Sequence, residues 1–275
     1  MNYRHSFHAG NFADLVKHAV VLDLMERLTA SAGPLTVVDT HAGAGIYDLS
    51  SSEASRSREA EAGIGRLMGE ATPGALRPLR LAVERLNEGA AVPLYPGSPW
   101  LIRQALRVDD TYVGCELNPP IHEALAGMLE GPGPGRAQAV LADGYDALSG
   151  LIVSTDQTLV LIDPPFERRD DYERAAVATG QVLATAPSAT VAIWTPLKDM
   201  ETFDGFMRRL KQVGARATAI EARLRPLDDP MRMNGCAMVL VGEPAGTIEA
   251  ARAAAEAVVA LLGDADGSVP VWSIG

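Results

Sequence analysis

The chain has 275 residues, 47% of them hydrophobic, which suits one α/β domain with an insertion and excludes a disordered protein. The net charge of −11 and the pI of about 4.9 argue against strong non-specific binding to nucleic acid. No N-terminal segment has the pattern of a signal peptide and no apolar run is long enough to cross a membrane, so we expect a cytoplasmic protein.

The N-terminal part of the chain is predicted to form a helix, then a strand, then a glycine-rich turn. Apolar spacing predicts a helix over residues 12–32 and then a buried strand over Leu35–Val38, which leads into Asp39–Gly45. Residues 46–96 have a different composition and pattern, with runs of Ser and Arg, helical stretches at 59–68 and 76–87, and no convincing strand. We therefore expect residues 46–96 to form a helical subdomain inserted into a domain made of residues 1–45 and 97–275.

After the insertion, strands and helices alternate regularly. Strands are predicted at 111–115, 137–142, 158–162, 190–194, 217–223 and 235–241. Helices are predicted at 98–107, 119–131, 172–184, 201–213 and 247–262, with a short one after residue 144 and a short tail at 269–274. This order implies a doubly wound, mostly parallel sheet whose last two strands form an antiparallel pair at the sheet edge.

Two cysteines, Cys115 and Cys236, lie far apart, each within an apolar strand-like run. This setting predicts buried free thiols rather than a disulfide or a metal pair.

The segment Asp163-Pro164-Pro165-Phe166 follows the strand at 158–162, at the end where open α/β sheets bind ligands. The Asp163 carboxylate and the Pro164 carbonyl can accept the two hydrogens of an exocyclic amine, and the Phe166 ring can stack on a base. The same four residues also make an ordinary strand-to-turn stop. The segment is thus either a plain turn or a site for a base that carries an amino group.

Asp39-x-x-x-Gly43-x-Gly45 directly follows the first strand, and its glycines permit positive φ and close approach of a ligand. A lone Gly-x-Gly is more often a plain turn. Asp48 stands where the third glycine of the dinucleotide fingerprint would fall, and no phosphate-binding loop is present, which disfavours NAD and ATP.

Acids end the following strands as well. Glu116 stands where an acid can take ribose hydroxyls, and Asp143 where a carboxylate can accept a hydrogen bond from an adenine amine. Asp163 ends a fourth strand. An acidic pocket of this kind suits the sulfonium and ammonium charges of S-adenosylmethionine.

Several motifs together resemble the bacterial 23S ribosomal RNA adenine-N6 methyltransferases of the RlmJ type. They are YRHSFHAGNFADLVKH at residues 3–18, then DTHAGAGIY, YPGSP, the strand-end glutamate, ADG and LIDPPF, in the right order from Tyr3 to Phe166. The similarity is weaker beyond about Trp194. The resemblance implies a Rossmann-like class I methyltransferase that uses S-adenosylmethionine to methylate N6 of one adenine in naked 23S rRNA. We expect a monomer that needs no metal.

The resemblance also assigns roles by motif. It implies cofactor contacts from Lys17, His18, His41, Ser98, Glu116, Asp143 and Gly144, which Asp39, Gly43, Gly45 and Asp163 join from the strand ends described above. Asp163 would be the catalytic residue, assisted by Pro164 and Phe166, and Tyr3 would lie near the target base or the phosphate backbone. Two features depart from the family: Phe166 stands where Tyr is frequent, and the acidic balance offers little general attraction for RNA.

Other interpretations stay open. His5, His8, His18 and His41 could be metal ligands, but no Cys joins them and their spacing fits no zinc pattern. The arginines of the insertion are either a solvated face or a grip on phosphates, and those after the Asp-Pro-Pro-Phe loop are of a kind that usually serves solubility; they are Arg56, Arg58, Arg66, Arg77, Arg80, Arg85, Arg168, Arg169 and Arg174.

Rival functions are a DNA adenine-N6 methyltransferase, a protein glutamine methyltransferase, or a non-catalytic cofactor-binding factor that associates with RNA. The N-terminal segment and the insertion favour RNA, since a DNA enzyme would carry a separate basic recognition domain. The complete Asp-Pro-Pro-aromatic loop favours catalysis.

Overall fold

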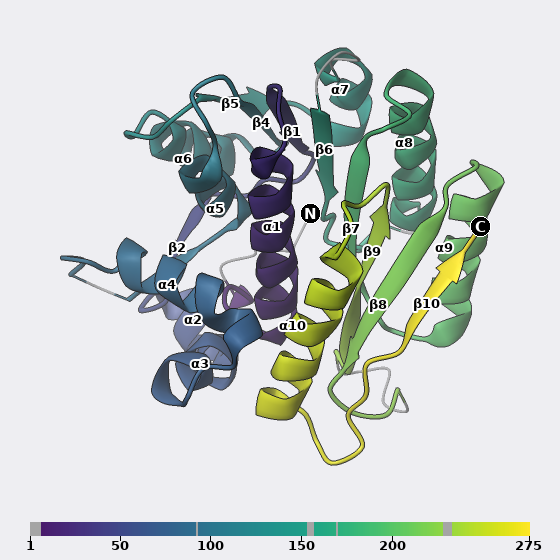
Figure 1. The fold of residues 1–275 in the computed structure, drawn as a ribbon. Coiled ribbons are helices and arrows are strands. Elements are labelled where there is room, and N and C mark those ends of the chain that lie inside the picture. Colours follow the sequence, from purple (N-terminus) through teal and green to yellow (C-terminus); the bar gives the residue numbers. More distant parts are fainter. Residues whose placement is uncertain (1–6, 92, 153–156, 169, 228–232) are drawn as a thin grey trace.

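A central eight-stranded sheet has the strand order β10-β8-β9-β7-β6-β1-β4-β5 (Figure 1). The computed structural model describes residues 7–91, 93–152, 157–168, 170–227 and 233–275. Five strands pair in parallel, namely β1 (Leu35–Asp39), β4 (Thr111–Glu116), β5 (Arg136–Leu141), β6 (Gln157–Ile162) and β7 (Thr190–Pro196). Antiparallel pairs join the rest, β8 (Ala217–Arg223), β9 (Gly235–Val241) and β10 (Val271–Ile274). The predicted mostly parallel sheet is confirmed.

Helices pack on both faces of this sheet, so successive side chains of its central strands, which point to opposite sides, enter two different cores. In β6, Leu159 and Leu161 belong to one apolar core while Val160 belongs to the other. The first core takes in side chains of α1 (Phe12–Ala30), α5 (Ser98–Ala105), α6 (Pro119–Leu129) and α10 (Thr247–Leu262). The second takes in those of α7 (Gly144–Leu151), α8 (Asp171–Thr185) and α9 (Met200–Gln212).

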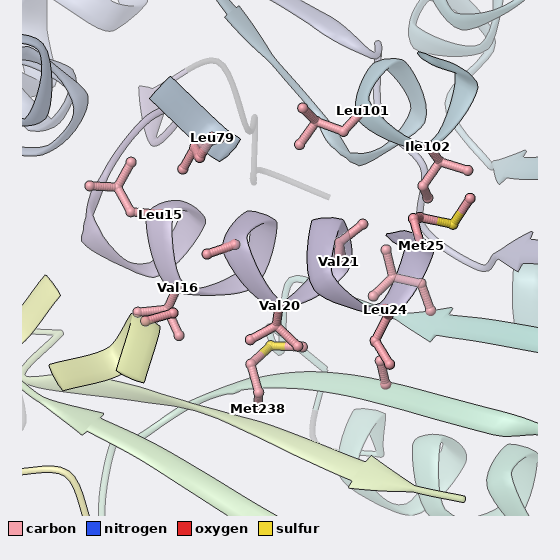
Figure 2. Close-up of a cluster of buried hydrophobic side chains, with 14 of the residues drawn as sticks. Leu15, Val16, Val20, Val21, Leu24, Met25, Leu79, Leu101, Ile102 and Met238 are labelled. Carbon is pink, nitrogen blue, oxygen red and sulfur yellow. The ribbon is translucent and has the colours of Figure 1, made fainter. Parts of the chain in front are cut away.

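Helix α1 is apolar around most of its circumference because it is covered on both sides. Figure 2 shows Val16 and Val20 directed toward the sheet, where Met238 of β9 lies, whereas Leu15 lies toward Leu79 on the far side. Asn11 begins the helix as its N-cap, and its side chain accepts hydrogen bonds from the amides of residues 13 and 14. This helix therefore packs between the sheet and the insertion.

The insertion contains strand structure that the sequence pattern did not predict. β2 (Ile46–Asp48) and β3 (Leu94–Pro96) form a two-stranded antiparallel ribbon at its two ends. Three residues per strand are too few to show alternation, which is why the prediction of no strand was wrong. Between them lie α2 (Ser52–Ser57), η2 (Glu61–Gly65), α3 (Arg66–Gly69), η3 (Gly74–Leu76) and α4 (Arg77–Leu86). Apolar side chains of this segment share the first core, so residues 46–96 pack as part of the domain surface.

The C-terminal pairing is confirmed in part. β8 and β9 are antiparallel neighbours as expected, but β9 lies between β7 and β8, and the segment predicted as a tail forms the edge strand β10. Trp272 of β10 donates a hydrogen bond from its indole to Glu221 of β8 at 2.5 Å, which fixes this edge strand. Cys115 and Cys236 are buried free thiols, as predicted. Among the described residues, no helix is both long enough and apolar enough to cross a bilayer.

Candidate active site

Four acids gather at the carboxyl edge of the parallel strands. Asp39 ends β1, Glu116 ends β4, Asp143 follows β5 and Asp163 follows β6. These strands are consecutive in the sheet, and the chain reverses direction across the sheet between β1 and β6. Such a switch point is where open α/β sheets bind ligands. The topology thus brings together acids that lie up to 124 positions apart in the sequence.

Asp163 is held by a buried lysine. Lys17 Nζ lies 2.6 Å from Asp163 Oδ2 and 2.9 Å from Asp14 Oδ1. Burial alone would lower the pKa of Lys17, but the two carboxylates raise it well above its usual value. Lys17 is therefore a fixed cation, and it engages one oxygen of Asp163 while the Asp163 side chain stays 15% exposed.

Asp39 is buried among hydroxyl donors. Ser98 donates to Asp39 Oδ2 at 2.8 Å, and the Tyr112 hydroxyl lies 3.4 Å from the same oxygen. Burial raises the pKa of Asp39 to about 6, against the lowering effect of the Ser98 hydrogen bond. Ser98, which was predicted to contact the cofactor, thus contacts Asp39 in this structure and orients its carboxylate.

The glycine-rich turn after β1 requires glycine at two positions. Gly43 and Gly45 have φ of +68° and +81°, where L side chains are strained. The Gly43 amide donates to Glu116 Oε2 at 3.2 Å, and the Gly97 amide donates to the Gly45 carbonyl at 2.8 Å. Side chains of Tyr47 and Met128 pack against the two glycines of positive φ, so an added Cβ at either position would clash. The carboxylates beside the turn favour a cationic, amine-bearing cofactor and disfavour a phosphate.

Two residues that the resemblance places against the cofactor have packing roles here. His18 is fully buried, and its Nδ1 lies 2.8 Å from the Tyr95 hydroxyl of β3. Gly144 begins α7 against the backbone of Thr40, where an added Cβ would lie 2.0 Å from the carbonyl oxygen. His18 joins α1 to the insertion, and Gly144 lets α7 approach the turn after β1.

Asp143 is paired with an arginine. Arg174 of α8 donates from Nη1 to Asp143 Oδ2 and from Nη2 to Asp143 Oδ1, each at 3.0 Å, and lies 4.6 Å above the Tyr145 ring. The rings of His41 and Tyr145 meet edge-on, with centroids 4.9 Å apart. Burial lowers the pKa of His41 to about 4, so this ring is neutral near pH 7.

Phe166 has an unusual backbone. Its φ is +49°, in the left-handed region, and the Lys198 ammonium donates to its carbonyl at 2.8 Å. The ring is 3% exposed and packs on Tyr172 and Trp194, with centroids 4.5 and 6.1 Å away. A base can stack on this ring only after the loop uncovers one of its faces.

The remaining predicted residues lie apart from this edge or outside the described part of the chain. Tyr3, His5 and Arg169, and the side chain of Arg56, fall outside the described residues. His8 contacts Glu59 of the insertion at 3.0 Å. Within the described part, no group of three His, Cys, Asp or Glu side chains is arranged to hold a metal.

Three site residues escaped prediction. Asp14 lies three positions before Lys17, a spacing that places both on one face of a helix and could have indicated the pair. Arg174 and Lys198 carry no local signal, because their partners Asp143 and Phe166 lie more than thirty positions away.

The sheet is mostly parallel, with the antiparallel strand β9 beyond β7. A glycine-rich turn follows β1, and an acid stands at the end of β1, β4, β5 and β6. These features define a class I S-adenosylmethionine-dependent methyltransferase. Residues 32–274 match the family model described as Ribosomal RNA large subunit methyltransferase D, RlmJ. The chain belongs to this family.

Known relatives agree over most of the length. The chain is 32% identical over 247 residues to Ribosomal RNA large subunit methyltransferase J of Escherichia coli K12, with 89% of this chain and 88% of that protein covered. It is 31% identical over 249 residues to the protein of the same name in Haemophilus influenzae, with the same coverage. A crystal structure of a Legionella pneumophila protein superimposes with a TM-score of 0.87 at 26% identity, covering 97% of this chain and 98% of that one.

Proposed function

We propose that this chain transfers the methyl group of S-adenosylmethionine to N6 of a specific adenine in 23S rRNA, and that naked rRNA is preferred to assembled subunits. One observation carries the proposal. Asp163 opens the Asp-Pro-Pro-Phe loop at the switch point of the sheet, with one oxygen engaged by Lys17 and the side chain still partly exposed. The large-subunit rRNA methyltransferases to which the chain is similar support the choice of substrate.

Each group of cofactor residues would meet a different part of S-adenosylmethionine. Asp39 and the backbone of the turn at Gly43 and Gly45 would receive the amino-acid end, Glu116 the ribose hydroxyls and Asp143 the adenine amine. Bound S-adenosylmethionine would supply an electrophilic methyl group on a sulfonium centre. The carboxylates at this edge favour that positive charge.

Asp163 and the Pro164 carbonyl would accept the two hydrogens of the adenine amine. These bonds favour a tetrahedral nitrogen whose lone pair is released from the ring, and they fix the line of attack. Positioning of this kind contributes on the order of 7–11 kcal/mol. Transfer would form the nitrogen–carbon bond as the carbon–sulfur bond breaks, with the electron pair left on sulfur. The proton that the methylated nitrogen loses would pass to the Asp163 carboxylate and from there to water. Lys17, which lies 2.6 Å from Asp163, would restrain the carboxylate during transfer.

The target base would have to leave its stack to reach Asp163, which costs a few kcal/mol and favours an unpaired adenine. Stacking on Phe166 would offset roughly 1–3 kcal/mol of that cost. Because the Phe166 ring is buried here, binding of the base would be accompanied by a change in the loop. By the family resemblance, Tyr3 would act near the target base. We further propose that the protein is a cytoplasmic monomer that needs no metal. Residues 46–96 would form an inserted subdomain.

The test is methyl transfer from labelled S-adenosylmethionine to deproteinised 23S rRNA, with assembled subunits and DNA in parallel and nucleoside mass spectrometry of the product. We expect N6-methyladenosine in naked rRNA. Asp163→Asn should lower the rate by roughly a hundredfold or more, a loss typical of a group that acts on the transition state. The matched control is Asp170→Asn, since Asp170 lies in the same loop and pairs with the exposed side chain of Arg168 rather than with Lys17. Methylated DNA, or cofactor binding without transfer to any nucleic acid, would contradict the proposal.

A further inference from the structure

Arg174 is the most fully engaged arginine near the site. Besides its two hydrogen bonds to Asp143, it lies 3.0 Å from Asp146 Oδ1 and stacks on the Tyr145 ring. Its side chain is 22% exposed, whereas the Arg168 side chain in the preceding loop is 54% exposed and pairs with the exposed carboxylate of Asp170. The solubility role expected for this group of arginines therefore does not describe Arg174.

The contact fixes the direction of the carboxylate. A planar guanidinium that meets both oxygens of a carboxylate holds its plane and its angle, which a point charge such as Lys does not do. Asp143 is also the N-cap of α7, where its Oδ1 accepts a hydrogen bond from the Tyr145 amide at 3.1 Å. Two independent groups thus restrain Asp143, one from α8 and one from α7.

The contact also fixes the charge. Partial burial alone would raise the pKa of Asp143, but the hydrogen bonds and the charge of Arg174 lower it. An ionised carboxylate only accepts hydrogen bonds. At this position it would therefore accept from an exocyclic amine and repel a carbonyl oxygen at the same place on the purine ring.

We propose that Arg174 is a positioning residue for cofactor recognition, which holds Asp143 in the one orientation and charge that select adenine over other purines. The inference rests on the proposed role of Asp143 as acceptor of the adenine amine. Arg174 contacts Asp143 and does not itself need to touch the cofactor. Its side chain comes from α8, whose first residue, Asp171, lies eight positions after Asp163.

The experiment measures the Kd of two ligands by calorimetry: S-adenosylhomocysteine, and its analogue with unsubstituted purine, which lacks the amine. Arg174→Met should weaken S-adenosylhomocysteine roughly ten- to a hundredfold, since it disturbs a charge-assisted hydrogen bond. It should change the affinity of the purine analogue less than about twofold. Arg168→Met, the matched control, should leave both affinities unchanged.

Three results of the affinity comparison would overturn the inference. Equal weakening of both ligands would mean that Arg174 only supports the fold, and unchanged affinity would mean that Asp143 needs no positioning. If Arg174→Met does not fold, Arg174→Lys keeps the charge without the bidentate contact and is measured with the same two ligands. If the wild-type protein binds both ligands equally, Asp143 is not the amine acceptor, and this inference fails while methyl transfer at Asp163 can still occur. Failure of methyl transfer alone leaves the ligand comparison unaffected.

Discussion

At the scale of single residues, the buried Asp39 carboxylate of the candidate site lowers the stability of the fold when it is ionised. Its side chain is fully buried and its pKa is raised to about 6 by that burial. A folded-state pKa above the unfolded value means that the folded state is favoured at low pH and loses stability as the pH rises through about 6. Near pH 7 the ionised carboxylate thus costs the fold up to about 3 kcal/mol.

Asp39→Asn should therefore not destabilise the protein at pH 7.5, even though it removes a hydrogen-bond acceptor that Ser98 uses. Thermal unfolding should give a Tm equal to or above that of the wild type, and this relative advantage should shrink toward pH 5 as wild-type Asp39 becomes protonated. The affinity for S-adenosylmethionine should fall, because a negative charge beside its cationic end is lost.

Asp110 is the matched buried carboxylate, since Arg107 and the Leu35 amide hold its pKa below the usual range despite burial. Its stabilisation is present above the unfolded pKa and is lost as the pH falls, so Asp110→Asn should lower Tm at pH 7.5. A Tm for Asp39→Asn well below that of the wild type at pH 7.5 would contradict the assigned cost.

At the scale of elements, helix α7 contains two glycines with opposite expectations. A Cβ at Gly144 would lie 2.0 Å from the Thr40 carbonyl oxygen, whereas a Cβ at Gly150 would meet nothing within 4 Å. Gly144→Ala should separate α7 from the turn after β1 and cost roughly 1–3 kcal/mol or more, as overpacking does. Gly150→Ala should be neutral or stabilise the helix by about 0.5–1 kcal/mol.

Urea unfolding of both variants tests this expectation. Because Gly144 supports the turn that holds His41, Gly144→Ala should also weaken cofactor binding, and Gly150→Ala should not. Equal stability of the two alanine variants would show that the backbone at Thr40 yields without cost, and would leave Gly144 available for the direct cofactor contact that the family resemblance implies.

Elements with long regular patterns could be predicted from the sequence, and short or paired ones could not. The buried strand β6 was expected from its continuous apolar run, and the acid after it from its position at the strand end. β2 and β10 have three and four residues and become strands only because β3 and β8 provide hydrogen-bond partners. The buried state of Phe166 likewise depends on Tyr172 and Trp194, which lie on other elements.

At the scale of the whole molecule, the net charge of −11 is notable in a protein proposed to act on RNA. Arginines of the insertion do not offset this charge freely, because several pair with acids on the same helical segment. Arg66 lies 3.2 Å from Glu70 and Arg80 lies 2.8 Å from Glu84. Exposed pairs of this kind are worth little to stability but lower the positive potential. We therefore expect specific rRNA binding with a shallow dependence on salt.

A matched pair of exposed arginines tests which surface meets the RNA. Arg66–Glu70 in the insertion and Arg252–Glu256 on α10 have the same four-residue spacing and similar exposure. Glu70→Gln and Glu256→Gln each release one arginine and change the net charge equally. If the insertion contacts RNA, only Glu70→Gln should raise the affinity for 23S rRNA and steepen the slope of log K against log salt by about 0.7, one single-strand phosphate contact. If both variants keep the slope of the wild type, the insertion approaches no phosphate at Arg66, and rRNA is recognised through the target loop and its immediate surroundings.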